Sequence, residues 1–134
     1  MNYLLDVNIL VAWGWSDHTD HDRVVTWISR MKLEKNARLL TSPIPQIGFV
    51  RVSVQRAGGL LTVDEASETL IGMLASLGKS HAFLPDDQPV EPWPAWCKSA
   101  GHTTDAHLQT LAERHRARLA TLDSGIPRAY LLPI

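Results

Sequence analysis

The chain begins with MNYLLDVNILVAW, residues 1–13, an apolar run that is interrupted by Asp6 and Asn8. The run predicts a short buried strand over Tyr3–Val7, followed by a helix that starts near Ile9 and is capped by Asn8. A carboxylate in a buried strand costs free energy unless it is paired, hydrogen-bonded or bound to a cation. Asp6 therefore indicates that partners reach it from other parts of the chain.

The composition predicts one compact domain that spans residues 1–134. Of these residues, 45% are hydrophobic and 20% are charged, and the net charge of −1 shows no basic excess, so a polyanion would have to bind a local patch. The single cysteine, Cys97, excludes an internal disulfide and fits a reducing compartment, for which we expect the cytoplasm. We expect neither a signal peptide nor a membrane-spanning segment.

Short apolar segments alternate with helical patterns along the rest of the chain. Strands are predicted near residues 38–42, 82–84, 118–122 and 131–134, and helices near residues 17–32, 45–55, 62–77 and 104–115. Thr62 and Glu65 form a capping-box pattern, and residues 85–101, rich in Pro and Trp, predict an irregular segment. The alternation predicts an α/β domain with a mostly parallel sheet of about four to five strands, covered on both faces.

Four polar side chains are expected at one edge of this sheet, outside the carboxyl ends of the strands. Asp6 and Asp123 follow strands, whereas Gln46 and Asp105 open helices on the side that carries the apolar stripe. Two carboxylates about 5 Å apart repel by roughly 3 kcal/mol at an effective dielectric constant of about 20. A cation removes this repulsion, and hard oxygen ligands without cysteine favour Mg²⁺ or Mn²⁺.

Each of these acids has a simpler explanation when it is taken alone. Asp105 suits the first turn of a helix, and Asp123, followed by Ser-Gly, suits a turn. Asp6 is harder to explain in this way, because strand interiors disfavour Asp. The coincidence of all three at one predicted edge favours a site.

Several segments of the chain together resemble PIN-domain proteins, in particular the VapC-type toxins of bacterial type II toxin–antitoxin pairs. They are LLDVN at 4–8, SPIPQIGFVR at 42–51 and TTDAHLQTLAERHRARLATLD at 103–123. The resemblance implies a three-layer α/β/α PIN-like fold and a Mg²⁺-dependent endoribonuclease that leaves 5′-phosphate and 3′-hydroxyl ends. It also implies inhibition by a cognate antitoxin protein and self-association into homodimers.

The same resemblance assigns roles to individual residues. It makes Asp6, Asp105 and Asp123 the catalytic and metal-binding acids, with Asn8 and Thr121 as supporting polar residues. We expect one principal Mg²⁺ held by Asp6 and Asp105, with Asp123 acting directly or through water.

Gln46 departs from the family pattern, because many members have a Glu at this position. As a catalytic group, Gln46 can still offer its amide oxygen to a metal ion, a water or the RNA, but it adds no negative charge. This substitution weakens the case for an arrangement of two metal ions.

Basic residues that could bind RNA phosphates are absent from the acid motifs themselves. Arg51 and Arg56, on the helix that Gln46 opens, are our main candidates for RNA contacts, followed by Lys79 and Arg128. For any one of these side chains, ordinary solvated surface charge is the simpler interpretation, and only Arg51, beside the family-like GFV, rises above it.

Three further features resemble sites but have simpler explanations. The acids of Asp17–Asp22, with their two histidines, suit the start of a helix better than a metal site, because no third distant ligand is identifiable. Trp93 and Trp96 could stack on an unpaired base, but we expect them to pack the irregular segment onto the domain. Cys97 lacks the motif of a nucleophile, and His102 is close enough to Asp105 in sequence to contact a substrate.

Two functions from other classes compete with a nuclease. A receiver or phosphatase-like domain also places an Asp at a strand end, but no second Asp follows Asp6 and no strand-end Lys is present. A non-catalytic PIN-like module that binds RNA or a protein partner is the stronger alternative. Gln46 and the absence of net positive charge both favour that alternative.

Overall fold

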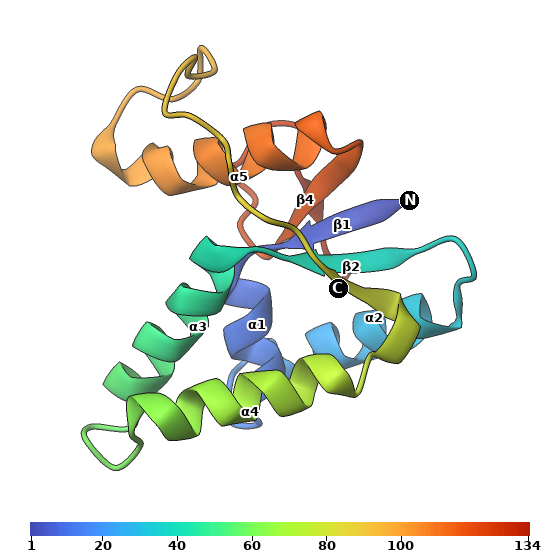
Figure 1. The fold of residues 1–134 in the computed structure, drawn as a ribbon, viewed down its shortest axis with the longest axis vertical. Helices are drawn as coiled ribbons and strands as arrows, with labels where there is room; N and C mark the ends of the chain where they lie inside the picture. Colours follow the sequence, from blue (N-terminus) through green and yellow to red (C-terminus); the bar gives the residue numbers. More distant parts are fainter.

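A parallel sheet lies between two layers of helices in the computed structural model, which describes all residues from Met1 to Ile134 (Figure 1). The strands are β1 (Asn2–Leu5), β2 (Arg38–Thr41), β3 (His81–Phe83), β4 (Ala117–Thr121) and β5 (Tyr130–Leu131). All five are parallel, in the order β3-β2-β1-β4-β5. The predicted α/β class, with a mostly parallel sheet in three layers, is confirmed.

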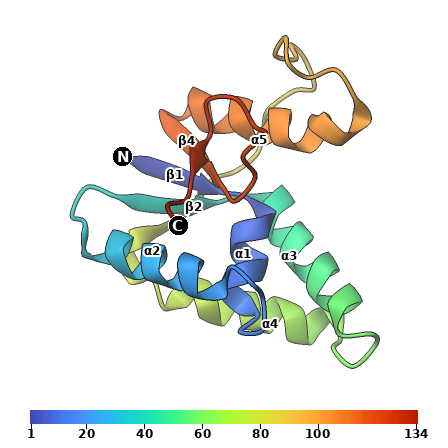
Figure 2. The ribbon, with the colours of Figure 1, turned by 180° about the vertical axis from the view of Figure 1, so that it is seen from behind.

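The helices are divided unequally between the two faces of the sheet, as Figures 1 and 2 show. One face is covered by α1 (Val7–Gly14), α2 (His21–Leu33), α3 (Pro43–Arg56) and α4 (Val63–Ala75), and the other by α5 (Thr103–Arg114). Two short 3₁₀ helices, η1 (Gly78–Ser80) and η2 (Ala100–His102), precede β3 and α5. No helix is both long enough and apolar enough to cross a membrane.

Each face of the sheet has its own hydrophobic cluster. In β1, Leu5 belongs to the cluster on the α1–α4 side, and its neighbour Leu4 belongs to the cluster beneath α5. Successive strand residues point to opposite faces, so a sheet covered on both sides needs continuous apolar strands. This requirement explains the uninterrupted apolar sequence of the strands and the sharp contrast that Asp6 makes with them.

The boundary between β1 and α1 differs from the sequence-based expectation. Strand β1 ends at Leu5, and Asp6 is the N-cap residue of α1, where its carboxylate accepts a hydrogen bond from the Val7 amide. Asn8 lies inside the first turn of α1 rather than capping a helix from Ile9, so that prediction is wrong. Asp and Asn are equally good N-cap residues, and pattern alone does not decide between them.

The connecting segments agree with several local predictions. Thr62 and Glu65 form the reciprocal capping box that starts α4. The Pro- and Trp-rich segment before η2 contains no strand or α-helix and lies beside α5 (Figure 1). There Trp96 Nε1 donates to Gln109 Oε1 at 3.1 Å, as expected for a side chain that packs this segment onto the domain, whereas Trp93 is 41% exposed.

Candidate active site

The carboxyl ends of β1 and β4 bring the first predicted site residues together. Leu5 pairs with Ala120 in the parallel register, so Asp6 and Thr121 follow as neighbours. The Thr121 hydroxyl donates to Asp6 Oδ2 at 2.8 Å, while Asp6 Oδ1 accepts the Val7 amide at 2.8 Å. With only 5% of its surface exposed, Asp6 is held by two hydrogen bonds in one orientation.

Asn8 and Asp123 are tied to the same hydroxyl. Thr121 Oγ1 accepts hydrogen bonds from Asn8 Nδ2 at 3.1 Å and from the Asp123 backbone amide at 3.0 Å. The Asn8 side-chain oxygen accepts the Leu122 amide at 3.2 Å, which fixes the turn that follows β4. The structure therefore places Asn8 and Thr121, the predicted supporting residues, between two of the predicted acids.

Asp105 approaches from the other helical layer, in the first turn of α5. Burial raises the pKa of its carboxyl to about 6, and repulsion from Asp6 and Asp123 acts in the same direction, against a smaller attraction from His102. Burial also raises the pKa of Asp6, although its hydrogen bonds to Thr121 and Val7 act in the opposite direction. The three acids thus share one electrostatic environment, in which their negative charges repel one another.

A cleft of about 480 Å³, which we call the acid cleft, is lined by these acids together with positively charged side chains. Asp6 and Asn8 line it from the β1–α1 junction, and His18 from the α1–α2 loop. Arg51 and Arg56 line it from α3. Thr104 and Asp105 belong to the first turn of α5, and Asp123 to the turn after β4. Arg51 and Arg56, the favoured RNA-contact residues, therefore lie at the acids. Lys79 and Arg128 do not line this cleft.

His18 and Thr104 are cleft residues that the sequence did not single out as part of the site. His18 belongs to the acidic stretch that we interpreted as a helix start, and no periodic pattern in a loop shows which side chains turn inward. Thr104 directly precedes Asp105 in the TTDAHL segment, and that adjacency is the one signal that could have identified it.

The carboxylate oxygens in the acid cleft are of the type that binds a hard cation, but they do not surround a common point as metal ligands do. No group of three His, Cys, Asp or Glu side chains lies close enough together to hold a metal ion. Asp6 uses both oxygens in hydrogen bonds, and Asp123 Oδ1 accepts the Gly125 amide at 2.8 Å. The acids offer carboxylate oxygens, no thiol lines the cleft, and the pKa values of Asp6 and Asp105 are raised first by burial, with repulsion between the acids acting in the same direction.

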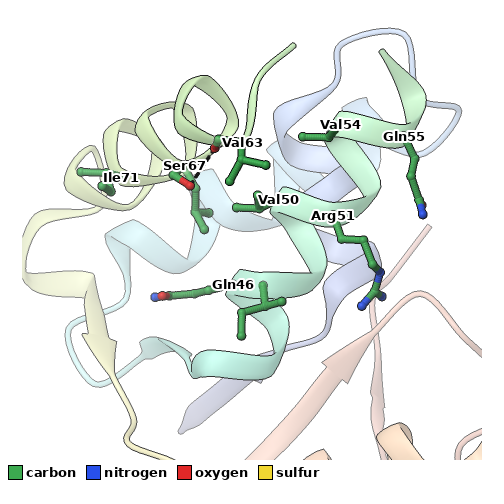
Figure 3. Close-up of a pocket in the computed structure, with 10 residues that line it drawn as sticks. Gln46, Val50, Arg51, Val54, Gln55, Val63, Ser67 and Ile71 are labelled. Carbon is green, nitrogen blue, oxygen red and sulfur yellow. Dashed lines mark hydrogen bonds between the residues drawn. The ribbon is translucent and has the colours of Figure 1, made fainter. Parts of the chain in front are cut away.

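Gln46 is the predicted site residue that the structure places elsewhere. Its Nε2 donates to Thr41 Oγ1 at 3.0 Å, and Thr41 is hydrogen-bonded to His81 Nε2 at 2.7 Å. Gln46 lines a separate groove of about 640 Å³ between α3 and α4, and Figure 3 shows its side chain pointing away from that of Arg51. In this structure Gln46 therefore does not line the acid cleft, where we expected it to join the three acids.

The position of Gln46 follows from the two neighbours of α3. Gly48 faces α1 so closely that a Cβ on it would lie 2.5 Å from Val7 Cγ2, next to Asp6. Gln46 lies two residues earlier, about 200° around the helix, and so faces away from α1. A helical wheel identifies the buried stripe of α3 but does not reveal which neighbour each part of that stripe meets.

Comparisons with known proteins agree with this architecture. The PIN domain family model matches residues 3–132. Ribonuclease VapC38 of Mycobacterium tuberculosis is 38% identical over 128 residues, covering 92% of this chain and 86% of the relative. Ribonuclease VapC39 of the same organism is 34% identical over 132 residues, covering 94% of this chain and 91% of the relative. The chain therefore belongs to the PIN domain family, and within it to the VapC type.

Proposed function

We propose that this protein is a Mg²⁺-dependent endoribonuclease, with Mn²⁺ as a possible substitute, and that it is the toxin of a type II toxin–antitoxin pair. The observation that carries the proposal is the sharing of one cleft by Asp6, Asp105 and Asp123, whose mutual repulsion calls for a cation. Relatives that bear the name ribonuclease match nearly the whole chain, which supports the same activity.

Asp6 and Asp105 are the residues that would hold the principal cation, with Asp123 as a direct or water-mediated ligand. Bound Mg²⁺ supplies a Lewis acid that lowers the pKa of a coordinated water and offsets charge on the transition state of phosphodiester hydrolysis. Asp105 and Asp123 are both more exposed than Asp6, so they have room to turn toward an ion beside the fixed Asp6 carboxylate. The displacement of Gln46 from the acid cleft removes a fourth ligand, which supports one principal ion rather than two.

The other residues of the cleft have roles that do not depend on the metal. Thr121 and Asn8 hold Asp6 and the turn before Asp123 in a fixed relation. Arg51 and Arg56 bind backbone phosphates and offset the repulsion between RNA and the acids. These contacts orient the phosphodiester over the acids, which is a large part of what an active site contributes to such a reaction.

A cognate antitoxin and a homodimer are the protein partners that we propose. The groove between α3 and α4 supports a protein-binding surface, because Ile47, Val63 and Ile71 on its walls are each at least 60% exposed (Figure 3). Such an apolar surface is unusual unless another chain covers it. Light scattering on the purified chain, alone and with the product of a neighbouring short reading frame, tests both assemblies.

The test of the activity uses purified protein, free of antitoxin, with structured RNAs in Mg²⁺ and in EDTA. We expect cleavage in Mg²⁺, none in EDTA, and none by Asp6→Asn, in which Asn preserves the N-cap of α1. Asp22→Asn is the matched control, because Asp22 is an exposed helix-start acid outside the acid cleft. Cleavage that persists in EDTA or in Asp6→Asn contradicts the metal mechanism.

Failure to cleave any RNA while RNA is still bound would favour the non-catalytic binding module instead. RNA binding by the Asp6→Asn protein does not depend on cleavage, so its measurement separates the two alternatives.

A further inference from the structure

The α1–α2 loop brings into the acid cleft a histidine that the proposed chemistry does not use. His18 lines the acid cleft, but unlike the acids it is able to donate a hydrogen bond. Its Nδ1 accepts a hydrogen bond from the Asp20 backbone amide at 3.0 Å. A ring nitrogen that accepts a hydrogen bond carries no proton, so the proton of the neutral ring is on Nε2. That Nε2–H has no hydrogen-bond partner within the chain.

This arrangement makes His18 a hydrogen-bond donor rather than a general acid. A neutral imidazole with Nδ1 already engaged has no spare proton to give to a leaving oxygen, but its Nε2–H can donate to an anionic oxygen. The acids of the cleft accept hydrogen bonds and repel anions, so a hydrogen-bond donor in the same cleft suits an anionic substrate.

Arg56 provides a second donor beside this loop. Its guanidinium lies 4.9 Å from the centre of the Trp15 ring, and Nη2 contacts Asp17 Oδ1 at 3.0 Å. Trp15 is itself fixed to α3 by its Nε1–H bond to Ser53 Oγ at 3.0 Å. The guanidinium is thus held in place before any ligand arrives, which reduces the entropy lost on binding.

The hydrogen-bond donors and the ring face that remain available near His18 and Arg56 indicate which ligand binds there. Arg56 covers the Trp15 ring, so that face of the ring is closed to stacking with a base. Asp17 is 72% exposed, and such a surface ion pair is weak enough for a stronger anion to displace it. A neutral N–H donor and a guanidinium both bind the anionic oxygens of a backbone phosphate well.

We propose that His18 and Arg56 form a subsite for an RNA backbone phosphate, in the same cleft as the acids and independent of the metal. The proposal rests on the proposed function in that RNA is the substrate, and it adds His18 to Arg56 as a residue of the cleft that binds the RNA backbone. His18 acts through its Nε2–H, and Arg56 acts through its charge.

The test measures RNA binding in an Asp6→Asn background with EDTA, by the anisotropy of a short fluorescein-labelled single-stranded RNA of mixed sequence at several KCl concentrations. His18→Asn keeps an oxygen that can accept the Asp20 amide but removes the Nε2–H, whereas His18→Gln returns an amide N–H near the Nε2 position. Arg56→Gln removes the charge. Asp17→Asn releases Arg56 from its competing carboxylate. His115→Asn and Arg30→Gln, at exposed positions outside the acid cleft, are the matched controls.

We expect His18→Asn to raise the Kd about ten-fold with an unchanged salt slope, because a neutral donor releases no counterions. His18→Gln restores most of the affinity. Arg56→Gln raises the Kd and reduces the salt slope by about 0.7, the value for one phosphate contact on a single strand. Asp17→Asn lowers the Kd.

The subsite is overturned if His18→Asn and Arg56→Gln weaken binding no more than the two controls do. It is also overturned if His18→Gln binds as poorly as His18→Asn, since His18 then serves only to shape the loop. RNA that binds in this way but is never cleaved in Mg²⁺ refutes the nuclease proposal and leaves the subsite standing. If the wild type cleaves RNA in Mg²⁺ but His18→Asn binds RNA normally, the nuclease proposal stands and the subsite is refuted.

Discussion

The Thr121 hydroxyl donates a 2.8 Å hydrogen bond to Asp6 Oδ2 and so joins the end of β4 to the start of α1. The same oxygen accepts hydrogen bonds from Asn8 and from the Asp123 amide. A hydroxyl has one proton and two lone pairs, so all three are used. Thr121 is therefore the residue through which two of the acids are positioned relative to one another.

Replacing Thr121 by Val tests this role, because Val has nearly the same shape but no hydroxyl. We expect a loss of about 1–3 kcal/mol in the free energy of unfolding, since Asp6 and Asn8 are left with unsatisfied polar atoms. The pKa of Asp6 should rise further, because the Thr121 hydrogen bond normally lowers it. Chemical denaturation and RNA cleavage are the measurements. Thr121→Ser, which keeps the hydroxyl, should retain most of both properties, and an equally large loss in that variant would argue against the hydrogen bonds.

The raised pKa of Asp105 predicts how stability depends on pH when no metal is bound. Its folded-state pKa is about 6 against an ordinary value of 3.8, so the folded state binds its proton more tightly than the unfolded state does. The group's contribution to stability is therefore lost as pH rises from about 4 to about 6, and it stays lost above that range.

Asp105→Asn should then stabilise the metal-free protein at pH 7.5. Because Asp105 is only partly buried, we expect a gain of about 1 kcal/mol, or about 4 °C in Tm, rather than the full value of the pKa shift. Thermal unfolding in EDTA at pH 4.5 and pH 7.5 checks this, with Asp22→Asn as the control that gains nothing comparable. Mg²⁺ should raise the Tm of the wild type more than that of Asp105→Asn. A variant that is less stable than the wild type at pH 7.5 would contradict the prediction.

The contact between Gly48 and Val7 predicts a steric effect on the same site. A Cβ at Gly48 would lie 2.5 Å from Val7 Cγ2 and 2.9 Å from Val7 Cγ1, so Gly48→Ala must push α3 away from α1. We expect it to cost about 1–3 kcal/mol of stability and to reduce cleavage, because Val7 directly follows Asp6.

Three further variants test whether this steric explanation is specific. Val7→Ala removes both methyl groups that a new Cβ would meet, so the double variant with Gly48→Ala should recover part of the lost stability. Gly72→Ala on α4, where a Cβ would meet nothing within 4 Å, should instead stabilise the protein by about 0.5–1 kcal/mol. Urea denaturation of the wild type, Gly48→Ala, Val7→Ala and the double variant gives the coupling energy, and strictly additive effects would rule out the clash.

Simple periodicity was sufficient to predict the sheet and the positions of the three acids. Continuous apolar strands alternating with helices indicate a parallel sheet, and such a sheet places the residues after β1 and β4 at one edge. Asp105 was predictable because it lies on the same side of α5 as the buried Leu108 and Ala112.

The features that the sequence did not reveal depend on which neighbour a side chain meets. Asp6 rather than Asn8 caps α1 because the strand ends at Leu5, two residues before the predicted end at Val7. His18 turns into the acid cleft from a loop, where no periodicity applies. Gln46 lies on the buried stripe of α3 as expected, but that part of the stripe meets β2 and α4 instead of the acids.

The placement of Gln46 leads to the last prediction, that Gln46→Ala leaves catalysis largely intact. The variant loses one hydrogen bond to Thr41, which should cost about 1 kcal/mol of stability, but it removes no group from the acid cleft. We expect its kcat to stay within about three-fold of the wild-type value, which corresponds to less than about 1 kcal/mol of transition-state stabilisation. Gln46→Glu should behave similarly, because its carboxylate would enter the α3–α4 groove and not the site of the metal. Steady-state RNA cleavage at saturating Mg²⁺ decides the matter. A fall of more than about a hundred-fold in Gln46→Ala, with an unchanged fold, would mean that α3 rotates to bring Gln46 to the acids when substrate binds.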